Sequence, residues 1–158
     1  METRAARPTD FDLLWPLAAS FRDTLRRNFP DNETLKVSLR HLLASGEGEF
    51  FLAIDDTGKA VGYVQQRYRY SIWMNGLEAA LEDLFVSPDS RGLGVGAELV
   101  RFAIHRAEAK GCESIKLDTN ESNLEAIHLY KRLGFSSGST RFSDSRQLSF
   151  ERTLNPSV

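Results

Sequence analysis

A glycine-rich loop at residues 91–97 has the residue types and spacing best suited to bind a ligand. Three glycines in seven residues let the main chain come close to a bound molecule. The loop precedes a predicted helix, whose first N–H groups lack acceptors inside the helix and favour an anion such as phosphate or diphosphate. A glycine-rich turn without a ligand is an equally good interpretation of this cluster alone. The loop residues are Arg91, Gly92, Leu93, Gly94, Val95, Gly96 and Ala97.

The loop has the glycine spacing of one nucleotide-binding motif and lacks the residues of another. Gly92-x-Gly94-x-x-Ala97 matches the dinucleotide fingerprint, and Asp118 ends the next predicted strand, where a ribose-binding acid would stand. Against this reading, the polar run at 87–91 separates the loop from the preceding strand, and too little chain follows for a doubly wound sheet. A Walker-type loop is excluded because no Gly-Lys-Ser/Thr follows.

Two neighbouring carboxylates interrupt an otherwise apolar strand predicted at 78–86. A carboxylate on a half-buried strand surface is costly unless it has a partner or a function. Because side chains alternate along a strand, Glu82 and Asp83 should point to opposite faces unless a bulge intervenes. At most one of them is therefore expected to face a cleft, and a salt-bridged structural acid is the alternative.

The elements that position these residues follow from apolar periodicity and turn signals. A strand at 3–6 precedes a helix capped by Thr9 or Asp10, in which Pro16 predicts a kink or a late start. A second helix ends near Gly46. Further predicted elements are a hairpin at 50–54 and 60–64 whose second arm reaches Ile72, strands at 78–86 and 114–118, a helix closed by Gly111, a helix that Ser122 and Glu125 open as a capping box, and two short strands within 135–154.

This order predicts one α/β (α+β) domain over residues 1–158. Hairpins first and strand–helix–strand units later give a mixed, mostly antiparallel sheet of six to seven strands, with helices on both faces. The sequence has 41% hydrophobic and 27% charged residues, as in an ordinary globular domain. A net charge of -2 predicts no general attraction to nucleic acid or membranes. One cysteine and three scattered histidines offer no disulfide and no metal site, so we expect a cytoplasmic protein.

Two sequence blocks resemble conserved segments of the GNAT-type N-acetyltransferases. Arg91-x-x-Gly94-x-Gly96 is similar to that family's motif A, (Q/R)-x-x-G-x-(G/A), and the preceding LFVSPDSRG resembles its strand and loop. The stretch from Asn123 to Phe135 resembles the family segment N-x-x-A-x-x-x-Y-x-x-x-G-F at about the usual distance. Together the blocks cover roughly residues 81–135, whereas the first eighty residues match only in the order of their elements.

The resemblance implies transfer of an acetyl group from acetyl-CoA to a primary amine in a ternary complex. In that fold a central parallel pair of strands splays apart and the pantetheine lies between them like an added strand. The backbone of Phe85 and Val86 would pair with it, the amides of 91–97 would hold the diphosphate, and an N–H near Phe85 or Val86 would stabilise the oxyanion. Arg91 would help with phosphate charge unless it is only a solvated arginine, and Asn123 would bond the pantetheine unless it only caps the helix.

The string Leu81-Glu82-Asp83-Leu84-Phe85-Val86 resembles the diamine (polyamine) acetyltransferase branch. That likeness implies Glu82 as the base that takes the proton of a diamine-like small amine, and Tyr130 as the acid that protonates the CoA thiolate. Tyr130 also lies on the apolar stripe of its helix, so packing is the alternative. Arg22, Arg26 and Arg27 on the first helix are awkward neighbours for a polycation.

Two other functions remain open at this point. One is a protein or peptide N-acetyltransferase, which needs an open groove instead of a closed pocket, and the other is a non-catalytic acetyl-CoA sensor. The presence of both Glu82 and Tyr130 argues against the sensor. The family commonly forms homodimers, so the resemblance also predicts a homodimer.

Overall fold

The computed structural model describes residues 1–137 and 150–154. Within them a single five-stranded sheet has the strand order β1-β2-β3-β4-β5, which is the order along the chain. Only β4 and β5 are parallel, and the other neighbours are antiparallel. The strands are β1 (Glu2–Ala5), β2 (Gly48–Ile54), β3 (Ala60–Ser71), β4 (Gly76–Val86) and β5 (Ser114–Leu117). The helices are α1 (Phe11–Thr24), α2 (Asn32–Ser45), α3 (Val95–Ala109) and α4 (Leu124–Arg132), with 3₁₀ turns η1 (Pro8–Asp10) and η2 (Pro88–Ser90).

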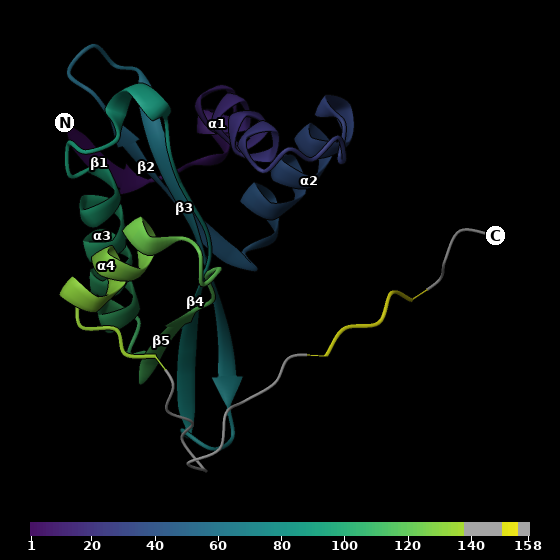
Figure 1. Cartoon of the computed structure of the whole chain (residues 1–158). Coiled ribbons are helices and arrows are strands. Elements are labelled where there is room, and N and C mark those ends of the chain that lie inside the picture. The colour runs from purple at the N-terminus through teal and green to yellow at the C-terminus, as the bar shows by residue number, and fades with distance from the viewer. Residues whose placement is uncertain (138–149, 155–158) are drawn as a thin grey trace.

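The helices cover the sheet in two layers, with α1 and α2 on one side and α3 and α4 on the other (Figure 1). On the first side, here called the α1 face, Leu14 and Leu17 pack with sheet residues that include Tyr63 and Phe85. On the second, the α3 face, Leu99 and other α3 residues pack with sheet residues such as Phe51, Val64 and Leu81. The predicted mixed sheet with helices on both faces is confirmed.

Three local predictions need correction. The α1 helix begins at Phe11 and continues through the exposed Pro16, so the late start predicted there as one of two alternatives is wrong, and the kink stays a prediction. Ser122 does not open α4, since its hydroxyl donates to Asn120 and Asn123 is the N-cap instead. The sheet has five strands in the described residues, not six to seven. Of the stretch expected to hold two more, 135–137 and 150–154 are not strands and the rest lies outside the described residues.

The hairpin, the long β3 and the helix after the glycine loop form close to their predicted bounds. The second arm ends at Ser71, one residue before the predicted end, and Asn75 turns the chain into β4 with a φ of 48°. Gly111 follows α3 with a φ of 76°, as a residue that ends a helix commonly does. None of the helices in the described part of the chain is long and apolar enough to cross a membrane.

Asp10 ties the edge strand β1 to the start of α1. Its carboxylate accepts hydrogen bonds from both terminal nitrogens of Arg4, at 2.7 and 2.8 Å, and from the backbone N–H of Arg7. The side chain is nearly buried, and hydrogen bonding from Arg4 lowers the pKa of Asp10 to about 2 from an ordinary 3.8. The ion pair therefore holds the first helix of the α1 face against the sheet.

Replacing Asp10 with Asn should lower the free energy of unfolding at pH 7 by about 1–2 kcal/mol, because a neutral amide cannot pair with Arg4. Since the folded pKa is depressed, this stabilisation is present above about pH 4 and is lost as the pH falls from about 4 to about 2. Urea denaturation at pH 7 and at pH 3 measures both effects. Asp12→Asn, an exposed neighbour on α1, is the control, and equal losses in the two variants would contradict the role of the pair.

Candidate active site

The strand β4 is paired on one side along its length but on the other side only in its first half. Its parallel pairing with β5 covers Glu78 to Leu81 and stops where β5 ends at Leu117. Pairing with β3 continues to Val86. Among the described residues, the last residues of β4 therefore have an open edge on the side of β5, as the predicted splay of the central parallel pair requires.

The register shows which main-chain groups face that open edge. Opposite residues of an antiparallel pair alternate between bonded and non-bonded pairs. Because Ser87 N–H donates to Val61 C=O at 2.9 Å, Phe85 bonds to β3, whereas Leu84 and Val86 turn their N–H and C=O groups away from it. A Cβ built on Gly62 would lie only 2.9 Å from the Phe85 carbonyl oxygen, which confirms that this oxygen faces β3.

This geometry corrects one expectation of the sequence analysis. The main chain of Phe85 is used inside the sheet. Within the described residues, Leu84 presents a free N–H and C=O at the open edge, and Val86 presents its N–H there while its C=O accepts from Arg91. Sequence reasoning missed Leu84 because an apolar strand residue carries no signal of which way its amide points. Only the hydrogen-bonding register of β3 and β4 shows the direction of the Leu84 amide.

The glycine loop has the conformation of an anion cradle. Gly92 and Gly94 have φ angles of 75° and 83°, a region that favours glycine, and a Cβ at either position would meet nothing within 4 Å. The helix α3 begins without a side-chain cap, and its first bond runs from Glu98 N–H to Gly94 C=O. In the described part of the chain, the N–H groups of residues 95–97 thus have no protein acceptor. The main chain present there fits a phosphate or diphosphate.

The loop, the end of β4 and α4 meet at one point. A Cβ at Gly96 would lie 3.5 Å from Leu129 of α4 and 3.8 Å from Val86. Tyr130, next to Leu129, packs against the α3-face cluster, as Val86 does, and its ring is 5.8 Å from that of Phe135 in an edge-on contact. Burial raises the pKa of the Tyr130 hydroxyl, so the group stays protonated at neutral pH.

Arg91 and Asn123 both make local contacts. The Nε of Arg91 donates to the Val86 carbonyl at 3.1 Å, and its guanidinium lies 5.9 Å from the centre of the Phe85 ring. Asn123 accepts a hydrogen bond from Ala126 N–H at 3.3 Å, so it caps α4 as the alternative reading had it. The roles of these two residues toward a phosphate and a pantetheine stay predictions.

A β-bulge separates the two carboxylates of β4. Gln65 pairs with Asp83 and Gln66 pairs with Leu81, so Glu82 is the extra residue that faces no partner on β3. The bulge reverses the alternation, because Leu81 and Leu84 both pack on the α3 face. Glu82 is exposed, whereas Asp83 is half-buried beside Tyr63, where burial and then the charge of Glu82 raise the pKa of Asp83 and Arg27 opposes them.

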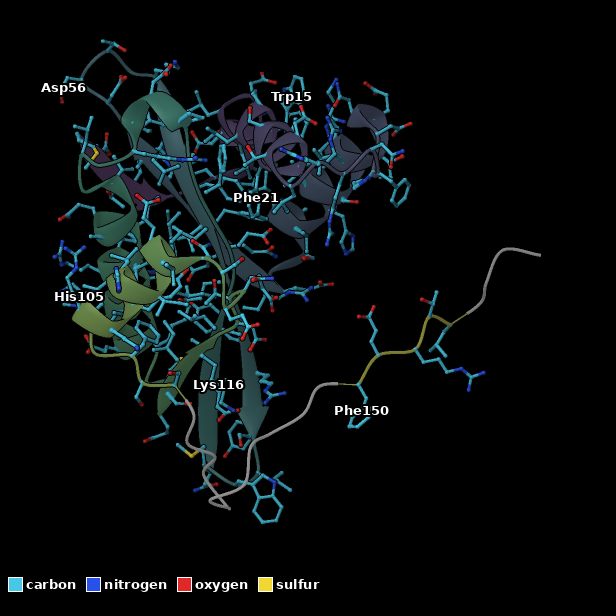
Figure 2. The ribbon with its side chains drawn as sticks, in the orientation of Figure 1. Trp15, Phe21, Asp56, His105, Lys116 and Phe150 are labelled. Atoms are coloured by element: carbon cyan, nitrogen blue, oxygen red, sulfur yellow. The ribbon has the colours of Figure 1, made fainter. Side chains whose placement is uncertain are left out.

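Two aromatic rings cover the α1 face of the sheet beside Asp83. Phe21 comes from α1 and points toward the sheet (Figure 2), with its ring 5.4 Å from that of Phe85 and 6.4 Å from that of Tyr63. The hydroxyl of Tyr63 makes no hydrogen bond within the described residues, and burial followed by the Asp83 charge raises its pKa. The Asp83 carboxylate therefore lies beside the rings of Phe21, Tyr63 and Phe85, which together are called the aromatic wall.

A groove of about 1080 Å³ extends from the glycine loop along the outer surface of α3. His105 lies on that outer surface (Figure 2). Among the groove's other lining residues are Leu93, Gly94, Ala97, Arg101, Arg132 and Leu133. Its arginines suit the negative end of a ligand held at the loop. Across residues 1–137 and 150–154, no three His, Cys, Asp or Glu side chains are grouped to hold a metal ion.

The sequence is similar to one protein family and to several individual acetyltransferases. Residues 15–135 match the model of the acetyltransferase (GNAT) family. A thialysine N-epsilon-acetyltransferase of Sus scrofa is 33% identical over 115 residues, which are 65% of this chain and 67% of that protein. An aminoglycoside N(6')-acetyltransferase type 1 of Stenotrophomonas maltophilia is 28% identical over 98% of this chain and 95% of its own length. The chain covers 43% of the Bos taurus thialysine N-epsilon-acetyltransferase, to which it is 38% identical over 74 residues.

Two further similarities concern substrate range and fold. A putative [ribosomal protein bS18]-alanine N-acetyltransferase of Bacillus subtilis is 28% identical over 89% of this chain and 87% of its own length. A crystal structure described as a probable acetyltransferase superposes with a TM-score of 0.85 at 22% identity, over 96% of this chain and all of that one. At that identity the superposition supports the fold alone. The relatives' names include both small-molecule and protein acceptors.

Proposed function

Because the chain belongs to the acetyltransferase (GNAT) family, we propose that it transfers the acetyl group of acetyl-CoA to a primary amine of a small molecule. The proposal includes one acetyltransferase domain over residues 1–158, a cytoplasmic location and a homodimer. Acetyl-CoA is the co-substrate that the family implies, and no metal enters the reaction as proposed.

The observation that carries the proposal is the open edge of β4 next to the anion cradle. The N–H and C=O of Leu84 and the N–H of Val86 need partners, and an extended pantetheine arm supplies them in strand-like fashion; the Val86 C=O accepts from Arg91. The amides of residues 95–97 then receive the diphosphate. In the α3 groove, Arg132 suits the remaining phosphate charge, whereas Arg101 is ion-paired with Glu98 at 2.8 Å.

The reaction joins the amine nitrogen to the thioester carbon and breaks the carbon–sulfur bond. An N–H of Leu84 or Val86 that faces the open edge stabilises the negative charge on the carbonyl oxygen, a role worth about 3–4 kcal/mol where such a donor was removed in other enzymes. The amine must first lose a proton, and a carboxylate of β4, Glu82 or Asp83, accepts it. Tyr130 donates a proton to the departing thiolate, since its hydroxyl is protonated at neutral pH.

The small-molecule acceptor is favoured by two of the relatives, whose names give thialysine and aminoglycosides as substrates. The Bacillus subtilis relative, named for a ribosomal protein, keeps a protein or peptide acceptor as the alternative. A non-catalytic acetyl-CoA sensor is the other alternative. Release of free thiol from acetyl-CoA, measured with a panel of amines and with alanine-initiated peptides, separates the three.

Acetyl-CoA should raise the melting temperature of the wild-type protein, and Gly94→Asp should abolish the shift. Binding at a hundredfold excess over Kd adds about 2.7 kcal/mol to the native state. The aspartate puts a side chain and a negative charge in the cradle at a φ of 83°. Differential scanning fluorimetry with and without acetyl-CoA measures the shift.

Gly58→Asp is the matched control for this experiment. Gly58 has a φ of 85° and open space around its Cβ position, like Gly94, but it lies in the β2–β3 turn. The control variant should suffer the same backbone strain and keep its acetyl-CoA shift. A Gly94→Asp protein that still responds to acetyl-CoA would show that the diphosphate binds elsewhere.

Tyr130→Phe should lower kcat by about 10²-fold or more and leave the affinity for acetyl-CoA nearly unchanged, because the ring stays and only the proton donor is lost. Steady-state thiol release gives kcat, and isothermal calorimetry gives the affinity. Tyr70→Phe, which alters an exposed tyrosine on the β3–β4 hairpin, serves as control. Wild-type turnover by Tyr130→Phe would assign Tyr130 to packing alone.

A further inference from the structure

The acceptor amine must reach the open edge of β4 from the α1 face. The anion cradle at the start of α3 and the contact of Leu129 with Gly96 and Val86 are on the α3 face, and so is Tyr130. A coenzyme held by these groups approaches from that side. Since an attacking nitrogen and the coenzyme cannot occupy the same space, the nitrogen arrives from the opposite face.

The bulge decides which β4 carboxylate is on that face. Asp83 pairs with Gln65 across the strands, two residues along from the pair of Phe85 with Tyr63. Side chains two apart share a face, so Asp83 shares the α1 face with Tyr63 and Phe85, whose packing there is established. Glu82 is the bulge residue that faces no partner on β3, and its side chain is exposed.

Asp83 is an acidic side chain among apolar and neutral neighbours on the α1 face. Phe85 and Phe21 are apolar, Gln65 is neutral and buried, and Tyr63 presents a hydroxyl. No hydrogen bond or ion pair occupies the Asp83 carboxylate within the described residues. A half-buried carboxylate without a structural partner is a candidate for function.

We propose that Asp83, and not Glu82, is the carboxylate that receives the acceptor ammonium group and removes its proton. The inference rests on the proposed function, whose base it identifies. It departs from the assignment that the sequence resemblance implies, which puts Glu82 in this role.

The proton balance of the step is complete. The ammonium group gives one proton to the Asp83 carboxylate, and the free amine forms the carbon–nitrogen bond as the carbon–sulfur bond breaks. The nitrogen gives up a second proton, and the departing thiolate gains one from Tyr130. Asp83 releases its proton to solvent, and Tyr130 regains the proton that the nitrogen lost, so that the products are the acetamide, CoA thiol and one proton.

Three charged or titratable groups act on Asp83 from the elements around it. Glu82 on its own strand adds negative charge, Arg27 after α1 adds a positive charge, and Tyr63 on β3 presents its hydroxyl. Burial, the largest influence, raises the pKa of Asp83, which makes it a better proton acceptor than a solvated carboxylate. An incoming cation also relieves the cost of a desolvated negative charge.

The test compares Asp83→Asn with Glu82→Gln in the full chain. The probe amine is thialysine, or the most active amine of the panel where that is another one. Asp83→Asn should lower kcat/KM for the amine at pH 7 by about 10²-fold or more. Glu82→Gln should cause a loss at least about tenfold smaller, since it changes only the charge beside Asp83. Asp12→Asn, an exposed carboxylate on α1, should behave as wild type.

The pH profile separates a proton-accepting role from a structural one. Asp83 accepts a proton only when ionised, so the ratio of wild-type to Asp83→Asn kcat/KM should be largest at neutral pH and shrink as the pH falls through the pKa of Asp83. Asp83→Glu, which keeps the charge, should restore part of the activity. A constant ratio over the whole pH range would assign Asp83 to structure and overturn the proposal.

The acetyl-CoA thermal shift distinguishes failure of this inference from failure of the proposed function. Every variant should keep the wild-type shift, because the cradle is unchanged. A Glu82→Gln loss equal to or larger than that of Asp83→Asn, with shifts intact, overturns the inference and leaves an acetyltransferase with Glu82 as its base. A wild-type protein with neither shift nor thiol release overturns the proposed function, and this inference with it.

Discussion

The structure depends on a strand whose hydrogen bonds are satisfied on one side and left open on the other. Main-chain N–H and C=O groups need partners, and an unpaired strand edge inside a protein normally finds one. Here β5 ends at Leu117, while β4 continues to Val86. The end of β4 is therefore held by β3 and, in the described part of the chain, has no strand on its other side, where we propose that the pantetheine pairs. The same edge explains why the Val86 carbonyl attracts the side chain of Arg91.

Rigidity around the open edge comes from both layers of helices. On the α3 face, Leu129 of α4 packs against the α3-face cluster and lies beside Gly96, where a Cβ would be 3.5 Å from it. On the α1 face, Phe21 locks against Phe85 and Tyr63, and Asp10 fixes the start of the same helix to β1. The proposed site thus lies between well-packed parts of the fold, and the sheet positions the main-chain groups that it offers.

Much of the fold and the positive φ angles of the glycine loop were predictable from the sequence. Periodicity predicts the helices, and turn residues such as Asn75 and the glycine at 111 mark real ends of elements. Glycines that need a positive φ, as Gly92 and Gly94 do, are recognisable because few other residues take their place. The N-cap of α4 was misplaced by one residue, since Ser122 and Asn123 are both good caps and only tertiary placement chooses between them.

The residues on the acceptor side of the proposed site could not be predicted, because the face that each one occupies depends on the register of β4 against β3. Alternation alone sends neighbours to opposite faces but cannot say which face each receives once an extra residue enters the strand. The bulge at Glu82 exchanges the faces of everything after it, so that Leu84 instead of Phe85 presents its amide and Asp83 instead of Glu82 enters the aromatic wall. A half-buried carboxylate beside a second negative charge opposes folding, and the positive charge of Arg27 offsets that cost only in part, since the pKa of Asp83 is still raised. An ammonium group that binds beside Asp83 would be attracted by its negative charge, whereas the neutral amide product would not. Substrate binding and product release would therefore both be favoured, as a transferase requires.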